Sequence, residues 1–153
     1  MSNLDAFLTM VATSEGTKNI PGGDDGYRVI VGSTHQNPHL FTSYADHPRM
    51  HIKLSETLTS SAAGRYQILE RYFDAYKSLL RLPDFGPASQ DAIAIQMIRE
   101  QHALADVYAG RFDVAVGKCS NIWASLPGNL YGQHQNALVD LRLAFTGAGG
   151  VIA

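Results

Sequence analysis

The order of hydrophobic periodicities along the chain is the feature that most limits its fold. Apolar residues recur every three or four positions from Asn3 to Ser14, which is the period of an amphipathic helix. A turn-rich stretch with short β-branched and aromatic segments follows, and helical periodicity returns from about Ser60 to Phe145. This order predicts an α+β fold in which a small sheet packs against a larger helical body.

A single acid, Glu15, stands where the first predicted helix ends. Gly16 is a plausible helix stop, because glycine adopts the left-handed C-cap conformation without steric cost. The partial negative charge at a helix C-terminus opposes ionisation of a carboxylate in the last turn. A half-buried Glu15 would therefore keep its proton to higher pH, as a general acid must. The local pattern alone favours an ordinary solvated glutamate, and only the rest of the chain changes that balance.

The turn-rich region contains three short segments of β character. Tyr27 to Val31 is β-rich and ends at Gly32, and the segments from Leu40 to Tyr44 and from Met50 to Leu54 are further candidates. We expect a small antiparallel sheet of two or three strands.

Four helical segments are expected after residue 60. The breaks between them are marked by prolines and glycines, which end helices. The segments run from Ile68 to Leu80, from an N-cap at Ser89 to about Tyr108, from Phe112 to Cys119, and from Tyr131 to Phe145.

Composition limits the class of protein. A chain of 153 residues with 45% hydrophobic and 17% charged residues is expected to form one domain, 1–153, with a real core. The net charge of −2 and the absence of a basic run argue against a nucleic-acid partner. No apolar run approaches the length of a membrane span, and no signal peptide is evident at the N-terminus. The single Cys119 fits folding in a reducing compartment as a buried, small apolar residue.

Histidines are concentrated in the turn-rich region but do not form a metal-binding motif. Four of the six, His35, His39, His47 and His51, lie there, without an HExxH or CxxC pattern. We expect no metal and no cofactor, and we interpret Asp46-His47-Pro48-Arg49 as a structural turn stiffened by its proline.

Several short motifs follow one another along nearly the whole chain. They include Ser14-Glu15-Gly16-Thr17, Gly26-Tyr27 with Val29-Ile30-Val31-Gly32, Asp46-His47-Pro48-Arg49, Ala63-Gly64-Arg65-Tyr66-Gln67, and Cys119 to Gly128 with Tyr131-Gly132-Gln133. In this order they resemble the motifs of endolysins of the phage lambda type, which are peptidoglycan lytic transglycosylases of the lysozyme-like superfamily. Two departures are an arginine, Arg28, where an aspartate is expected, and a few extra residues around Thr34 to His39.

The resemblance implies a lysozyme-like fold, with a mostly helical lobe, a small antiparallel β-sheet lobe and a glycan cleft between them. It implies that Glu15 is the catalytic acid, which protonates the oxygen linking N-acetylmuramic acid to N-acetylglucosamine. In a transglycosylase the muramic C6 hydroxyl then attacks its own anomeric carbon, so that proximity replaces a second carboxylate. Asp24, Asp25 and Asp46 are candidates for a second carboxylate by position only, and each is also a plausible loop or turn former.

The same resemblance suggests residues that bind the glycan. Gln67 lies in a glycine-to-glutamine motif that lines the cleft in lytic transglycosylases, and its amide would donate to an N-acetyl or lactyl group. Aromatic rings offer apolar faces with one polar edge to sugars, although Trp123 fits a core position equally well. The candidates for substrate binding are therefore Gln67, Tyr131, Tyr66, Trp123 and Tyr27.

The expected partner is the glycan strand of peptidoglycan. Without an export signal, the protein is expected to remain as a monomer in the host cytoplasm until a holin opens the membrane and releases it to the cell wall. Two alternatives remain. One is a hydrolytic lysozyme with water as the nucleophile, and the other is a non-catalytic peptidoglycan-binding or virion structural module on the same fold.

Overall fold

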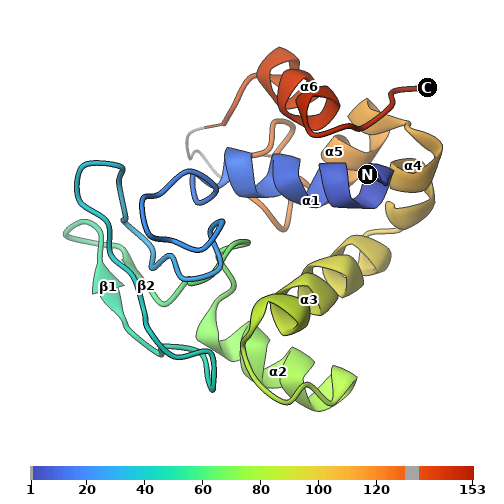
Figure 1. Ribbon diagram of the computed structural model, residues 1–153. Helices are drawn as coiled ribbons and strands as arrows, with labels where there is room; N and C mark the ends of the chain where they lie inside the picture. The colour runs from blue at the N-terminus through green and yellow to red at the C-terminus, as the bar shows by residue number, and fades with distance from the viewer. Residues whose placement is uncertain (1, 130–134) are drawn as a thin grey trace. The chain divides into compact units, whose positions relative to one another are not determined.

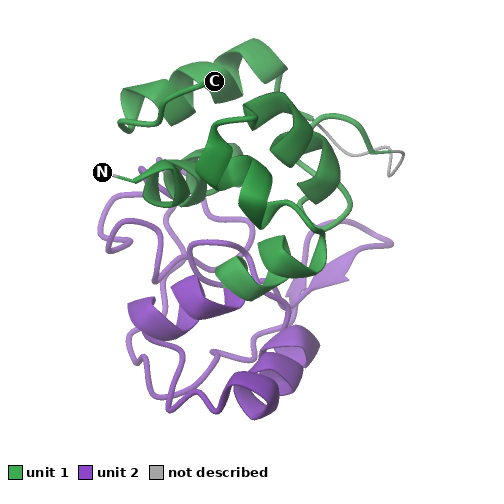
Figure 2. Ribbon diagram, turned by 90° about the vertical axis from the view of Figure 1, so that its right-hand side faces the viewer, with its two compact units in different colours: residues 1–15, 94–153 green, residues 16–93 purple. Residues whose placement is uncertain are grey.

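The computed structural model describes residues 2–129 and 135–153, and the chain divides into two compact units (Figure 2). Unit 1 comprises Met1–Glu15 and Ala94–Ala153, and unit 2 comprises Gly16–Ile93. The α+β class is confirmed, since the structure contains helices and a small antiparallel sheet, and the expectation of a single domain over 1–153 stays a prediction.

Unit 1 is built from helices around α1 (Asn3–Ser14). Helix α1 packs against α6 (Leu138–Gly147) and α4 (Leu104–Ala109), and α4 packs against α5 (Phe112–Cys119) (Figure 1). Three buried aromatic rings join these helices, with centroids 6.2 Å apart for Phe7 and Phe112 and 4.8 Å apart for Phe112 and Phe145. Cys119 is fully buried among these helices, as the sequence predicts.

Both ends of α1 are set by local chemistry. The Ser2 hydroxyl accepts from the Asp5 backbone N–H, and the Asp5 carboxylate accepts from the Ser2 backbone N–H, which makes a complete capping box. At the other end Glu15 is the C-cap, and Gly16 follows with a φ of 77°. The predicted bounds of this helix and its glycine stop are confirmed.

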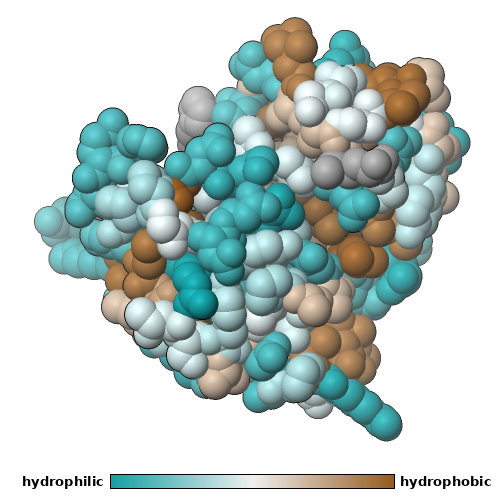
Figure 3. Space-filling view, in the orientation of Figure 1, coloured by the Kyte–Doolittle hydropathy of each residue, from teal (hydrophilic) through white to brown (hydrophobic). Residues whose placement is uncertain are grey.

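Helix α6 is apolar on more than one side. It buries Leu141 and Phe145, but Val139 and Leu143 are exposed (61% and 66%), and apolar surface is visible over this part of unit 1 in Figure 3. Within residues 2–129 and 135–153, no helix is long and apolar enough to cross a lipid bilayer.

The sheet of unit 2 has two antiparallel strands, within the two or three predicted, but only one of the three predicted segments contributes a strand to it. It consists of β1 (Ile52–Lys53) and β2 (Thr59–Ser60), which pair antiparallel with Ile52 opposite Ser60. The segments from Tyr27 to Val31 and from Leu40 to Tyr44 form only the isolated bridge between Val29 and Leu40, together with a bridge from Ile30 to Ala63. Positive φ angles at Gly26 (96°) and Gly32 (82°) bend the first segment at both ends, so it cannot extend into a ladder.

The later helices differ from the predicted ones at three places. Helix α2 begins at Glu70 and ends at Leu80, close to the prediction, whereas α3 (Pro87–Glu100) begins two residues before Ser89 and ends well before Tyr108. His102, with a φ of 56°, breaks the predicted long helix into α3 and α4. Helix α6 begins at Leu138 rather than at Tyr131, a residue that lies outside the described part of the chain.

His47 is part of the core of unit 2. Its ring lies 4.9 Å from Phe85 and 5.8 Å from Phe73, between centroids. Its Nδ1 accepts from the Arg49 backbone N–H, so Nε2 carries the hydrogen and donates to the Ile68 carbonyl at 2.8 Å. Burial lowers the pKa of His47, which favours this neutral form.

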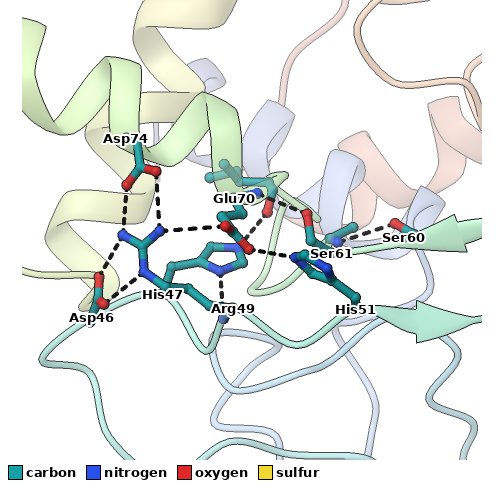
Figure 4. Close-up of polar contacts among 10 residues, drawn as sticks. Asp46, His47, Arg49, His51, Ser60, Ser61, Glu70 and Asp74 are labelled. Carbon is teal, nitrogen blue, oxygen red and sulfur yellow. Dashed lines mark hydrogen bonds and ion pairs between the residues drawn. The ribbon is translucent and has the colours of Figure 1, made fainter.

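Ion pairs connect the segment from Asp46 to Arg49 with helix α2 (Figure 4). The Arg49 guanidinium bonds to the Asp46 carboxylate at 2.9 Å and to the Asp74 carboxylate of α2 at 2.6 Å, and it lies 3.8 Å from Glu70. His51 contacts the other oxygen of Glu70 at 2.8 Å. These contacts confirm a structural role for the segment, whereas a turn over all four of its residues is not assigned in the structure.

Candidate functional site

Glu15 occupies the C-cap of α1, where its side chain is half-buried. Burial raises the pKa of Glu15 to about 7, because it disfavours the charged form, and a hydrogen bond with the side chain of Ser125 opposes this rise. At neutral pH a substantial share of the molecules therefore carries the proton on Glu15. Such a carboxyl group can both give and take a proton under physiological conditions.

Ser125, the partner of this carboxyl group, belongs to a cluster of three connected polar residues in unit 1. The hydroxyls of Ser14 and Ser125 are 2.8 Å apart, and the Asn136 amide nitrogen lies 3.0 Å from both the hydroxyl and the carbonyl oxygen of Ser14. The Asn136 backbone N–H also donates to the Ser125 carbonyl at 2.8 Å. These residues come from the end of α1, the loop after α5 and the segment before α6.

The sequence did not single out Ser125 or Asn136 as site residues. Ser125 lies inside the motif from Cys119 to Gly128, which was a usable signal, but Asn136 had none. The Asn136 side chain donates to Ser14, which lies 122 positions earlier in the sequence, and a local sequence pattern cannot predict such a long-range contact.

Gln67 lies in unit 2 with a φ of 51°, and its amide is half-buried. Its Nε2 donates to the Gly64 carbonyl at 2.9 Å and lies 3.4 Å from the Val29 carbonyl. Both amide hydrogens are thus used within the unit, so a glycan contact of Gln67 would use its Oε1 as an acceptor. Its role in binding stays a prediction.

The side chains of Tyr66 and Tyr27 share one acceptor. The two hydroxyls donate to the same oxygen of Asp91, at 2.6 Å and 2.9 Å, and their rings meet edge to face. Burial is the largest cause that raises the pKa of both hydroxyls, in Tyr27 to about 12. Tyr66 is fully buried and presents no ring face to a sugar, whereas Tyr27 is half-buried.

The remaining aromatic candidates differ in what the structure shows of them. Trp123 is only 2% exposed and packs in the core. It therefore offers no open ring face to a sugar. Tyr131 lies outside the described residues.

Each of the three candidates for a second carboxylate is engaged within unit 2. Asp24 accepts from the Tyr44 hydroxyl, Asp25 pairs with Lys18 at 2.8 Å, and Asp46 pairs with Arg49. Among residues 2–129 and 135–153, no three His, Cys, Asp or Glu side chains are arranged to hold a metal ion.

Arg28 stabilises the loop that follows it. Its guanidinium lies 4.1 Å from the centre of the Tyr44 ring and donates to the backbone carbonyls of Phe41 and Thr42. An aspartate could not make these bonds, because it has no donor. Arg28 thus stabilises the segment from Phe41 to Tyr44, and the expected departures from the family at Arg28 and around Thr34 to His39 stay predictions.

The family model described as Endolysin matches residues 5–152. The chain is 47% identical to the endolysin of Escherichia phage P2, over 99% of this chain and 95% of the relative. It is 48% identical to the endolysin of Escherichia phage lambda, over 96% of this chain and 91% of the relative.

Solved structures give the same relationship. The lysozyme of bacteriophage lambda complexed with a chitohexasaccharide matches with a TM-score of 0.93 and 47% identity, covering 100% of this chain and 98% of that one. A second structure of lysozyme from bacteriophage lambda matches with a TM-score of 0.89 and 46% identity, with the same coverage. The predicted lysozyme-like fold is confirmed by these matches.

Proposed function

Because the chain belongs to the endolysin family, we propose that it is an enzyme that cleaves the glycan strands of peptidoglycan, with Glu15 as its catalytic acid. The observation that carries this proposal is the state of Glu15, a half-buried carboxyl group with a pKa raised to about 7. An acid with a pKa near the working pH combines a large protonated fraction with a useful driving force for proton transfer. The chitohexasaccharide bound by the related lambda lysozyme is a β-linked glycan, which supports a glycan as the substrate.

We further propose that the bond between N-acetylmuramic acid and N-acetylglucosamine is cleaved by lytic transglycosylation. Glu15 protonates the glycosidic oxygen, and the bond from that oxygen to the muramic anomeric carbon breaks. The C6 hydroxyl of the same sugar attacks that carbon and gives its proton to Glu15, which restores the acid. The ring closes as the 1,6-anhydro sugar, and no water is consumed.

The partners of the candidate second carboxylates support this pathway over hydrolysis. A hydrolase needs a carboxylate free to act as nucleophile or to activate water. Asp24, Asp25 and Asp46 are each held by a donor in unit 2, and in unit 1 Asp106 and Asp113 are paired with cations. A substrate hydroxyl that is already attached beside the reacting carbon avoids the need for any of them.

Mass spectrometry of the soluble products from purified peptidoglycan tests the pathway. We expect muropeptides that end in 1,6-anhydro-N-acetylmuramic acid, each lighter by one water than the hydrolysis product, with no new reducing ends. Mainly reducing N-acetylmuramic ends would identify a hydrolytic lysozyme instead. Absence of any soluble product, from a folded protein that still sediments with peptidoglycan, would identify a binding module.

Access to the wall is a separate part of the proposal. The substrate lies outside the inner membrane, so we propose that the enzyme acts only after a holin or an equivalent agent opens that membrane. Expression of this chain alone in a Gram-negative host should leave cells intact, and addition of chloroform should cause rapid clearing. Clearing during expression, while the membrane still excludes a non-permeant dye, would reveal a route of export that does not need a holin.

A further inference from the structure

We propose that Asn136, Ser14 and Ser125 form a one-way hydrogen-bond chain that positions the Glu15 carboxyl group. In this chain Asn136 donates to Ser14, Ser14 donates to Ser125, and Ser125 donates to Glu15. The role of this hydrogen-bond chain in catalysis rests on the proposed function. The hydrogen bonds themselves lie within unit 1, and their effect on Glu15 can be measured without substrate.

The direction of the chain begins at Asn136. Its side-chain nitrogen lies 3.0 Å from the Ser14 carbonyl oxygen, which can only accept. The group at this position is therefore the NH₂ and not the amide oxygen. The same nitrogen lies 3.0 Å from the Ser14 hydroxyl oxygen, so that hydroxyl accepts from Asn136 and its own hydrogen must point elsewhere.

The Ser14 hydrogen has a partner at the right distance. The Ser125 hydroxyl oxygen is 2.8 Å from that of Ser14, and it also bonds to the Glu15 carboxyl group. When Glu15 is ionised it can only accept, so the single Ser125 hydrogen must point to Glu15. Ser125 must then accept from Ser14, which completes one direction along the whole chain.

The segment that carries Asn136 is held in place independently of its side chain. Its backbone N–H donates to the Ser125 carbonyl at 2.8 Å, and the adjacent Gln135 side chain donates to the backbone and side-chain oxygens of Asn129 at 3.0 Å each. Asn136 and Ser125 are therefore joined through the backbone as well as through the Ser14 hydroxyl.

The chain has two consequences for Glu15. In the ionised state one carboxyl oxygen accepts from Ser125, which leaves the other oxygen available to take up a proton. After the proton leaves, the Ser125 bond stabilises the carboxylate that remains, which limits how far burial can raise the pKa. Burial raises this pKa, and the Ser125 hydrogen bond lowers it.

The first experiment is a titration of the Glu15 carboxyl carbon by NMR, without substrate, in the wild type and in three variants. Ser125→Ala should raise the pKa of Glu15 by about one unit or more, because it removes a hydrogen bond to the charged form. Ser14→Ala should raise it by less, because Ser125 can still donate. Ser125→Thr, which keeps a hydroxyl, should restore a value near that of the wild type.

Ser120→Ala is the matched control. Ser120 is another buried serine of unit 1, and its hydroxyl donates to the Gly117 carbonyl at 2.9 Å, away from the chain. This variant should leave the titration of Glu15 unchanged. An unchanged pKa in Ser125→Ala, or equal shifts in Ser125→Ala and Ser120→Ala, would overturn the proposed chain.

The pH dependence of turnover separates this inference from the proposed function. If Glu15 is the acid, the loss of kcat/KM at high pH should move upward in Ser125→Ala by the same amount as the titration, because kcat/KM reports the pKa of the free enzyme. A structural defect alone would lower kcat at every pH without moving its midpoint, and would contradict a positioning role. The NMR titration of Glu15 could shift as expected while the pH dependence of wild-type turnover does not follow the pKa of Glu15. That result would support the hydrogen-bond chain and would contradict the assignment of Glu15 as the catalytic acid.

Discussion

Replacement of Glu15 by glutamine is expected to reduce the rate of peptidoglycan cleavage by at least about a hundredfold, since general acid catalysis contributes roughly a hundred- to ten-thousand-fold. The amide is nearly isosteric with the carboxyl group and can still accept from Ser125, but it cannot deliver a proton. The rate of release of soluble fragments from purified peptidoglycan measures the effect, and circular dichroism checks that the fold is kept.

Glu100→Gln is the matched control for this change. Glu100 is a glutamate of unit 1 at the end of α3, where it is exposed to solvent. Its replacement should leave activity close to that of the wild type. If Glu15→Gln retained more than about a hundredth of wild-type activity, Glu15 would not be the catalytic acid.

The second large effect concerns stability. Phe85→Ala should lower the free energy of unfolding by about 3–5 kcal/mol, the usual cost of removing a phenyl group from a core. Phe85 is fully buried, and its ring lies 5.9 Å from Phe41 and 4.9 Å from both Phe73 and His47, between centroids. Three aromatic contacts and a buried volume are lost together. Denaturant unfolding of the purified variant measures the change.

Tyr72→Ala is the matched control for Phe85→Ala. Tyr72 is an aromatic residue of the same unit, but it is 43% exposed on α2. Its replacement should cost less than about 1 kcal/mol, as is usual for surface positions. Equal losses in the two variants would mean that the aromatic cluster around Phe85 is not a principal source of stability.

The N-terminal helix and its acid were predictable because their signals are local. The apolar spacing from Asn3 to Ser14 and the glycine at position 16 specify a helix and its end within one short segment. Glu15 is the adjoining residue, so its place at the C-cap follows. Its burial could not be predicted in this way, because burial depends on what the rest of the fold places over it.

The small sheet was predicted only in part, because β-rich composition does not ensure pairing. The segment from Tyr27 to Val31 has the residues of a strand, but the left-handed glycines on both sides turn the backbone away. The actual strand β2, Thr59–Ser60, is polar and only two residues long, which leaves no periodicity to detect.

The residues predicted to bind the glycan show that residue type alone does not identify a binding residue. Tyr66 and Trp123 were candidates because aromatic rings bind sugars, yet both are buried. An aromatic ring is also the largest apolar group available to a core, so the sequence alone could not separate the two uses. The raised pKa of the Tyr66 hydroxyl and its bond to Asp91 identify a buried polar contact instead.

The raised pKa of Glu15 also links the site to stability. A carboxyl group whose folded pKa lies above its unfolded value binds its proton more tightly in the folded state. Its contribution to stability is therefore complete below the unfolded pKa of 4.5 and is lost as pH rises to about 7. The loss amounts to about 3 kcal/mol, at 1.36 kcal/mol per pKa unit, and Glu15→Gln should remove this dependence.

The measurement that most directly tests the central role of Glu15 is the titration of its carboxyl carbon by NMR in the folded wild-type protein. Selective assignment by comparison with Glu15→Gln identifies the signal. A midpoint near pH 7 is expected, because burial outweighs the hydrogen bond from Ser125. A midpoint near 4.5, the ordinary value for a glutamate, would show that Glu15 is ionised at neutral pH and would contradict its assignment as the acid.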